Sequence, residues 1–223
     1  MTDDADINRL SAVPLFSPMD ATALSALGEA GETRAFAKGR EIDVYEDDRL
    51  IVLLSGAVAL SVREADRVAI LSTVRGPQSL NLACVMARAG CQIRWRALED
   101  STVLLLPAVL FREAVSRDPG LAARAYAELA VAHQQLLSGA AEQRLQSTQR
   151  RLAGYLLSLV PRRSGRARVQ LPYEKHLLAS LLGMTPENFS RALGRLSDYG
   201  VSVQGPDVDI DRVERLRARL DAM

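Results

Sequence analysis

In the last third of the chain, apolar and polar positions alternate with a helical period, which predicts two short helices in succession. Residues 174–182 carry leucines at helical spacing, and Gly183 supplies the left-handed residue that commonly ends a helix. Thr185, Pro186 and Glu187 then provide a hydroxyl N-cap, a proline at the first helical position and a carboxylate in the first turn. This combination predicts the start of a second helix.

The second of these helices has two contrasting sides. Its apolar side is formed by Phe189, Ala192, Leu193 and Leu196. Its polar side is formed by Thr185 at the cap and by Glu187, Asn188, Ser190, Arg191 and Arg195. Two strands are predicted at residues 201–203 and 208–210, around a Gly-Pro turn. Ala179 and Gly183 are small, as expected where two helices pass closely. The pattern as a whole is typical of a winged helix-turn-helix.

The polar side of the second helix has the chemistry of base recognition in the DNA major groove. An arginine can donate two hydrogen bonds to guanine, a glutamate can accept from the cytosine amino group, and a serine can bond to either kind of edge. Recognition helices present their N-terminal residues to the bases, and Glu187, Ser190 and Arg191 lie in the first two turns. Taken singly, Glu187 could merely complement the helix dipole and Arg191 could be a solvated charge. The surrounding pattern favours DNA binding.

An all-β region followed by a long helix is predicted for the first two thirds of the chain. Short apolar runs at residues 51–54, 57–62 and 102–106, punctuated by glycines, are typical of an antiparallel barrel or jelly roll. Asp118 and Pro119 then open a long helix. Along it, small and apolar residues recur in steps of three and four, as in a coiled-coil seam: Ala122, Ala125, Leu129, Ala132, Leu136 and Gly139. Either this seam forms a homodimer interface, or it packs on the preceding domain of its own chain.

The predicted elements define an α+β chain with three parts. Residues 1–117 form an N-terminal antiparallel β jelly-roll sensor domain, residues 118–146 form a dimerisation helix and hinge, and residues 147–223 form a C-terminal winged helix-turn-helix DNA-binding domain. Within the last part, a fresh helix is expected from Ser147 or Thr148 to Leu159.

Composition and charge agree with two joined globular domains. With 223 residues, 48% of them hydrophobic and 25% charged, the chain can bury two cores. No apolar run reaches membrane-spanning length and the N-terminus is acidic, so we expect a cytoplasmic protein without a membrane partner. Residues 1–140 contain 14 Lys and Arg against 18 Asp and Glu, whereas residues 141–223 contain 14 against 9. An acidic sensor joined to a basic DNA-binding module would give this asymmetry.

Seven arginines in the basic part are candidates for contacts to DNA phosphates, or else belong to a solvated basic surface. They are Arg144, Arg150, Arg151, Arg162, Arg163, Arg166 and Arg168.

The motif Glu187-x-x-Ser190-Arg191 is similar to the recognition signature of the fumarate-nitrate branch of the CRP/FNR superfamily. The superfamily is named after the cyclic-AMP receptor protein and the fumarate-nitrate reduction regulator. Residues 13–216 resemble that superfamily. The match is specific in the helix-turn-helix and looser in the sensor domain, where it rests on residues 13–17, 38–42, 53–58 and 97–107. The resemblance implies a cyclic-nucleotide-binding-like jelly roll, a homodimer, double-stranded DNA and RNA polymerase as partners, and a TTGAT-like palindrome as the DNA site.

The resemblance also argues against cyclic AMP as the effector. Where cyclic-nucleotide-binding members have a glycine and a glutamate, this chain has Leu80 and Asn81. The phosphate-binding arginine and its neighbour become Cys91 and Gln92, and the two hydroxyl residues of the long helix become Leu136 and Leu137. A buried phosphate would lack its charge-assisted partner.

The effector itself stays unknown. An iron–sulfur cluster needs four thiolates, whereas this chain has only Cys84 and Cys91, so no such cluster is expected. The chain resembles the relatives that sense gases such as nitric oxide through haem, including the dissimilatory nitrate regulators, in lacking a nucleotide site and a cysteine cluster. That resemblance implies haem as a candidate cofactor, in an effector pocket with His133 as its axial ligand. The residues of that expected pocket are Leu80, Asn81, Cys91, Gln92, His133, Leu136 and Leu137. The two cysteines otherwise serve as buried small hydrophobes or as a thiol switch.

The sequence therefore predicts a homodimeric, sequence-specific DNA-binding transcription regulator. The alternative is a non-catalytic ligand-binding or redox-switch protein that uses the Cys84 and Cys91 thiols. No enzyme is expected, because the sequence offers no Ser/His/Asp order at plausible spacing, phosphate-binding glycine motif or metal-ligand cluster.

Overall fold

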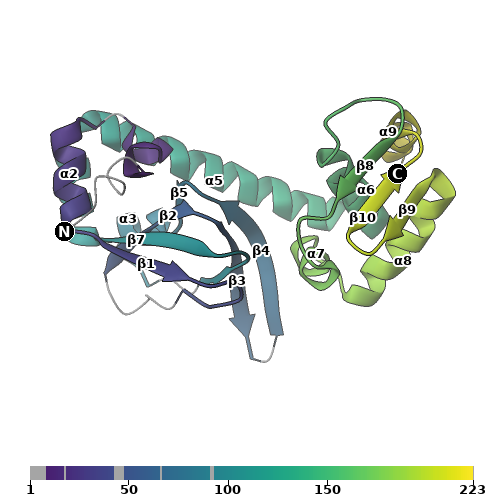
Figure 1. The fold of residues 1–223 in the computed structure, drawn as a ribbon, viewed down its shortest axis with the longest axis horizontal. Coiled ribbons are helices and arrows are strands. Elements are labelled where there is room, and N and C mark those ends of the chain that lie inside the picture. The colour runs from purple at the N-terminus through teal and green to yellow at the C-terminus, as the bar shows by residue number, and fades with distance from the viewer. Residues whose placement is uncertain (1–8, 18, 43–47, 66, 91–92, 223) are drawn as a thin grey trace. The chain divides into compact units, whose positions relative to one another are not determined.

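The computed structural model describes residues 9–17, 19–42, 48–65, 67–90 and 93–222. The chain divides into two compact units, Met1–Gln134 and Gln135–Met223, called here the N-terminal unit and the C-terminal unit (Figure 1). The long helix α5 (Pro119–Leu145) contributes residues to both.

The N-terminal unit is built on two antiparallel sheets, with strand orders β1-β7-β2-β5 and β4-β3-β6 (Figure 1). The strands are β1 (Glu32–Phe36), β2 (Arg49–Ser55), β3 (Ala57–Glu64), β4 (Arg67–Arg75), β5 (Gln78–Ser79), β6 (Arg94–Ala97) and β7 (Ser101–Pro107). The strands predicted at residues 51–54, 57–62 and 102–106 are confirmed within β2, β3 and β7. Gly56 makes the tight link between β2 and β3, because its φ is +95° and an added Cβ would lie 2.3 Å from the Ser101 hydroxyl oxygen.

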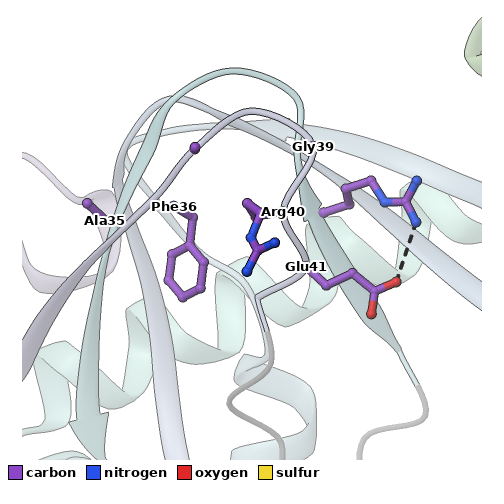
Figure 2. Close-up of a pocket in the computed structure, with 7 residues that line it drawn as sticks. Ala35, Phe36, Gly39, Arg40 and Glu41 are labelled. Atoms are coloured by element: carbon purple, nitrogen blue, oxygen red, sulfur yellow. Dashed lines mark hydrogen bonds and ion pairs between the residues drawn. The ribbon is translucent and has the colours of Figure 1, made fainter.

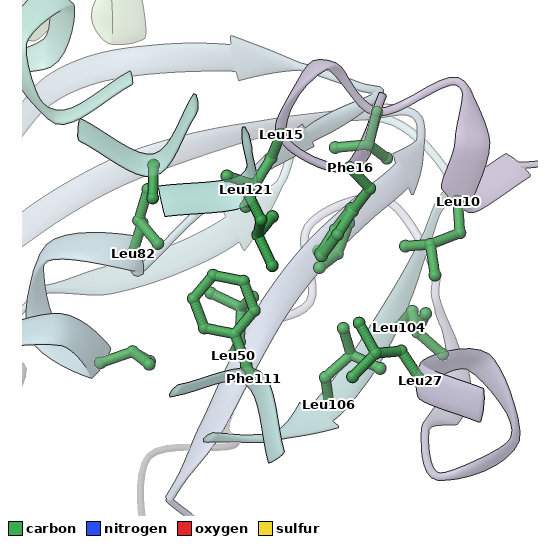
Figure 3. Packing of buried hydrophobic residues seen from close by; sticks show 14 of the residues in the cluster. Leu10, Leu15, Phe16, Leu27, Leu50, Leu82, Leu104, Leu106, Phe111 and Leu121 are labelled. Atoms are coloured by element: carbon green, nitrogen blue, oxygen red, sulfur yellow. The ribbon is translucent and has the colours of Figure 1, made fainter. Parts of the chain in front are cut away.

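The central strands β2 and β7 are apolar on both faces because both faces are covered. Leu50 and Leu104 belong to a core shared with the helices (Figure 3). In this core the rings of Phe16 and Phe111 pack edge to face, with their centroids 6.1 Å apart. The helical elements of this unit include η1 (Pro14–Phe16), α2 (Ala21–Glu29), α3 (Leu82–Ala87) and α4 (Ala108–Arg117), together with the start of α5. The opposite faces of β2 and β7 join Trp95 of β6 in a second core. Continuous apolar runs are typical of strands buried on both faces.

Helix α5 starts as predicted, but part of its apolar seam lies in the core of its own unit. The Asp118 carboxylate accepts hydrogen bonds from the backbone N–H groups of Gly120 at 2.8 Å and Leu121 at 3.1 Å, which caps the helix. Ala125 is 1% exposed within this core, and Leu129 packs against it. The seam prediction is therefore wrong for Ala125, which is not accessible to a second helix.

The C-terminal unit combines four helices with a three-stranded antiparallel sheet of order β8-β10-β9. Its elements after α5 are α6 (Thr148–Ser158), β8 (Ala167–Gln170), α7 (Lys175–Leu181), α8 (Pro186–Leu196), η2 (Ser197–Tyr199), β9 (Val201–Gln204), β10 (Asp207–Ile210) and α9 (Val213–Ala222). The two wing strands and the helix after Ser147 are confirmed, and the Ser147 hydroxyl accepts from the Arg150 backbone N–H at 3.2 Å. Strand β8 and helix α9 are additional elements that the sequence analysis did not predict.

Among the described residues, none of the helices combines the length and apolar character needed to cross a membrane.

Candidate nucleic-acid interface

The turn between α7 and α8 has the tight geometry that the sequence predicts. Gly183 follows the end of α7 with a φ of +63°, and the Met184 backbone N–H donates to the Ala179 carbonyl oxygen at 2.9 Å. The Thr185 hydroxyl then accepts from the Asn188 backbone N–H at 3.3 Å and caps α8. The two helices are thus joined by a short connection whose backbone groups are already paired.

The expectation that Gly183 is small because α7 and α8 pass closely needs correction. Ala179 is fully buried, as expected at a close approach. A Cβ built on Gly183, however, would meet the side chain of Gln143 on α5 at 3.1 Å. The positive φ and the neighbouring α5, rather than a contact with α8, therefore require glycine here.

Helix α8 separates its apolar and polar sides cleanly. Phe189, Ala192 and Leu196 are at most 3% exposed and anchor the helix in the core of the C-terminal unit. The predicted DNA-binding residues lie on the other side, where Thr185, Glu187, Ser190, Arg191 and Arg195 are exposed and Asn188 is half-buried. The structure therefore brings these six residues together on one accessible helix face.

Hydrogen bonds within the first turns of α8 favour the ionised form of Glu187 and restrain the guanidinium of Arg191. Hydrogen bonding from the Glu187 backbone N–H, then from the Thr185 hydroxyl, lowers the pKa of the Glu187 carboxyl, and the Arg191 charge adds to the effect. Glu187 is thus an ionised acceptor at neutral pH. Arg191 donates from Nη2 to Asn188 Oδ1 at 2.6 Å, which restrains its guanidinium on the same face.

The seven basic candidates for phosphate contacts differ in whether other groups of the fold already bind their guanidinium groups. Arg162 and Arg163 are exposed in the segment between α6 and β8. The guanidinium of Arg151, by contrast, donates to the carbonyl oxygens of Gln146 at 2.7 Å and Leu182 at 2.9 Å. Arg151 therefore caps the ends of α5 and α7, a structural role that the sequence analysis missed.

The other basic candidates differ in how far they are occupied. Arg150 donates to the Leu220 carbonyl oxygen at 2.5 Å, Arg168 pairs with Asp207 at 3.1 Å, and Arg166 approaches Asp211 at 3.5 Å. Arg144 is exposed. Of the seven, Arg144, Arg162 and Arg163 are exposed, and their side chains pair with none of the described residues.

The second half of the α5 seam is exposed, in contrast to its first half. Leu136 of the seam is 60% exposed and its neighbour Leu137 is 59% exposed, whereas Ala125 in the first half of the seam is 1% exposed. Ala132 is exposed and Gly139 is half-buried. An apolar helix face that water reaches in one chain is a candidate for contact with another surface.

The expected effector pocket is not supported by the residues that the structure describes. The Asn81 amide is occupied by β2, because Asn81 Oδ1 accepts from the Ile51 backbone N–H at 2.8 Å and Nδ2 donates to the Arg49 carbonyl oxygen at 2.9 Å. Leu80 packs against the Trp95 core. Asn81 therefore has a structural role, and Cys91 and Gln92 lie outside the described residues.

A haem site at His133 is not supported either. His133 is exposed on α5, and its helix neighbours at positions 132, 134, 136 and 137 are exposed as well. A haem pocket would enclose its axial ligand in an apolar wall. Within the described part of the chain, no group of three or more His, Cys, Asp or Glu residues is placed to hold a metal ion. Cys84 takes part in a disulfide bond.

The C-terminal unit carries the clearest match to known proteins. Residues 150–219 match the family model of the Crp-like helix-turn-helix domain. None of the curated proteins matches the sequence.

Solved structures match nearly the whole chain. A protein from Ruegeria pomeroyi, provisionally described as a cyclic nucleotide binding protein, is 25% identical, with a TM-score of 0.60 and coverage of 99% of both chains. FixK2 from Bradyrhizobium japonicum is 20% identical, with a TM-score of 0.68 and coverage of 84% of this chain and 96% of its own. A Eubacterium rectale protein, provisionally described as a transcriptional regulator of the Crp/Fnr family, is 17% identical, with a TM-score of 0.72 and coverage of 94% of this chain and 98% of its own.

These likenesses establish the fold: an N-terminal cyclic-nucleotide-binding-like jelly roll, a long helix and a C-terminal Crp-like helix-turn-helix domain, as in Crp/Fnr regulators. They confirm the fold class that the sequence predicts. The assignment to the fumarate-nitrate branch is not decided by them.

Proposed function

We propose that this protein is a cytoplasmic, homodimeric transcription regulator that reads a TTGAT-like palindrome through α8 and is not an enzyme. The observation that carries the proposal is the exposed polar face of α8, with Glu187, Ser190 and Arg191 held on a helix whose opposite side is buried. The match of residues 150–219 to a Crp-like helix-turn-helix supports the same conclusion.

Each of the three residues has a defined part in reading the half-site. Arg191 donates two hydrogen bonds to the guanine, which is the commonest specific contact in the major groove. Glu187, which its helix N-terminus keeps ionised, accepts from the amino group of the cytosine paired with that guanine. Ser190 contacts a thymine. For the Arg191 contact to form, its hydrogen bond to Asn188 has to be shared or released.

The exposed arginines outside α8 add affinity rather than sequence information. Arg162 and Arg163 are accessible and would contact phosphates on either side of the groove. Contacts of this kind strengthen binding to any sequence and weaken as salt concentration rises.

A palindromic site requires two readers related by a two-fold axis. We assign the dimer contact to Leu136 and Leu137 in the second half of α5, because the seam residues Ala125 and Leu129 already pack in the core of the N-terminal unit. RNA polymerase is the expected protein partner of the bound dimer. The effector is neither cyclic AMP nor an iron–sulfur cluster in this proposal, and the pairing of Asn81 with β2 supports the first exclusion.

A gel-shift experiment tests DNA recognition, and light scattering tests the dimer. We expect retardation of a duplex with two inverted TTGAT half-sites and much weaker retardation of a scrambled duplex. Leu136→Asp should produce monomers because it places a charge in the dimer contact, whereas Gln135→Asp, an exposed polar neighbour, should not. Equal retardation of both duplexes would contradict the recognition, and a dimeric Leu136→Asp variant would contradict the assigned contact.

A further inference from the structure

A cavity opens on the N-terminal unit where the segment after β1 passes strand β6. Its volume is about 630 Å³, and it is bordered by the Phe36 ring, by Gly39 and Arg40, and by Glu41 and Arg96 (Figure 2). This cavity is separate from Leu80 and Asn81, the positions at which the sequence analysis expected an effector. Its walls combine an aromatic surface with cationic side chains.

Positive charge is concentrated beside this cavity. The Glu41 carboxylate lies 3.4 Å from a guanidinium nitrogen of Arg96, 3.6 Å from one of Arg94 and 3.8 Å from one of Arg63. The antiparallel pairing of β3 with β6 places these arginines on adjacent strands, with side chains that are about half exposed. Arg40 is also exposed, and its guanidinium makes no hydrogen bond or ion pair with any described residue.

Among the described residues, the guanidinium groups of this arrangement outnumber the carboxylates that pair with them. One carboxylate is shared by three guanidinium groups, and none of the three makes the short bidentate contact of a strong pair. Like charges held this close repel one another, and exposed ion pairs contribute little to stability. An anion placed in the cavity would relieve the repulsion and would receive hydrogen bonds from Arg40 and Arg96.

We propose that the cavity binds a small organic dianion that has a planar apolar group, such as an aryl phosphate. Its anionic group is held by Arg96 and Arg40, and its planar part lies against Phe36. The proposal does not depend on the DNA-binding function proposed above, because every residue that carries it belongs to the N-terminal unit.

The chain contains a reporter for this site. Trp95 is its only tryptophan, lies between Arg94 and Arg96 on β6, and is 2% exposed. Anions could also bind to the basic C-terminal unit, which contains no tryptophan. A change in Trp95 emission therefore reports on the sheet beside the cavity rather than on the DNA-binding face.

The test is a titration of the full-length protein with phenyl phosphate and with inorganic phosphate at constant ionic strength. We expect a saturable change in Trp95 emission, with tighter binding of phenyl phosphate because its ring packs on Phe36. Arg96→Ala should weaken binding roughly tenfold, the usual effect of losing a charge-assisted hydrogen bond. Glu41→Gln should tighten binding several-fold, because the carboxylate that competes for the arginines is gone.

Two further variants keep the test decisive. Arg117→Ala removes an exposed arginine that pairs with Glu113 on α4, and it should leave binding unchanged. If Arg96→Ala unfolds the sheet, Arg40→Ala replaces it, since the Arg40 guanidinium pairs with none of the residues that the structure describes. Three results would overturn the proposal: no saturable emission change with either phosphate, equal binding by wild type, Glu41→Gln and the arginine variants, or binding of polyglutamate alone. The last result would assign the arginines to an acidic protein partner.

Discussion

Helix α8 and the β5–α3 segment contain the two sites that the sequence assigns to DNA and to an effector, and their polar groups are used differently. On α8, Glu187, Ser190 and Arg191 are exposed while apolar side chains hold the helix from behind. In the β5–α3 segment, the Asn81 amide is bonded to the backbone of β2, and the buried Ser79 hydroxyl donates to Glu128 on α5. The first set of groups is available to a ligand, whereas the second holds the fold together.

The comparison teaches that residue type alone does not identify a binding site. A polar side chain can serve a ligand only where the local backbone does not already occupy its hydrogen-bonding groups. At the start of α8, Thr185 and Glu187 bond to backbone N–H groups of their own helix turn, but the side chains of Glu187, Ser190 and Arg191 stay exposed. In the β5–α3 segment, by contrast, backbone groups of β2 bind both ends of the Asn81 amide.

The largest expected effect comes from removing the anchor behind the α8 face. Phe189→Ala deletes a ring that is 1% exposed and should destabilise the C-terminal unit by about 3–5 kcal/mol. DNA binding should be lost with it. Denaturation followed by far-UV circular dichroism measures the change, while Trp95 emission reports on the N-terminal unit, which should unfold at the wild-type denaturant concentration. Unchanged stability would contradict the anchoring role of Phe189.

The next effect sharpens the contrast at Asn81. Asn81→Ala leaves the Ile51 N–H and the Arg49 carbonyl without their side-chain partner and should cost the N-terminal unit about 1–3 kcal/mol. Asn81→Asp keeps the acceptor and loses the donor. Its free energy of unfolding should therefore lie between those of the wild type and Asn81→Ala. Denaturation followed by Trp95 emission gives both values. If Asn81→Ala is as stable as wild type, the hydrogen bonds from the Asn81 amide to β2 do not stabilise the fold. Asn81 would then again be a candidate for effector binding.

Arg151 and Arg162 form a matched pair for the basic residues. Arg151→Ala removes the cap on α5 and α7 and should destabilise the C-terminal unit by about 1–2 kcal/mol. Arg162→Ala should leave stability unchanged, weaken binding to all DNA sequences alike and lower the salt dependence of binding by about one unit. Salt titrations of DNA binding together with thermal denaturation separate these outcomes. The reverse result would exchange the two roles.

The smallest effect concerns the Glu128 carboxyl, whose pKa is raised because burial disfavours its charged form. A carboxyl with a raised folded-state pKa contributes stability that is fully present below its ordinary pKa and is lost as pH rises through the raised value. Glu128→Gln remains neutral and can still accept from Ser79. The variant should therefore melt above wild type at neutral pH, with the difference shrinking toward pH 4. A difference that is independent of pH would show that ionisation of Glu128 is not involved.

Much of the fold could be predicted from the sequence because local chemistry decided it. The Asp118 and Ser147 caps, the positive φ at Gly183 and the continuous apolar runs of β2 and β7 each depend on residues close in the chain. The polar face of α8 was predictable for the same reason. Its residues share a helix, so spacing alone places them together.

The predictions that failed depend on contacts between distant segments. Whether Ala125 faces a second chain or its own core is decided by how α5 packs on the sheet, which periodicity along one helix does not reveal. The sequence suggested that Arg151 contacts a DNA phosphate. Its guanidinium instead donates to carbonyl oxygens at the ends of α5 and α7, which lie far apart in the sequence. The arginines around Glu41 come from two strands, β3 and β6, that lie far from Glu41 in the sequence, so no local motif indicated them.

The central claim, that α8 reads DNA through Glu187, Ser190 and Arg191, is tested most directly by selection from randomised duplexes with wild type and Arg191→Ala. We predict that wild type enriches inverted TTGAT-like half-sites. Arg191→Ala should lose its preference at the guanine position alone, by about 1–3 kcal/mol, with unchanged stability because the side chain is exposed. Enrichment of an unrelated half-site, or an unchanged guanine preference in Arg191→Ala, would contradict the account.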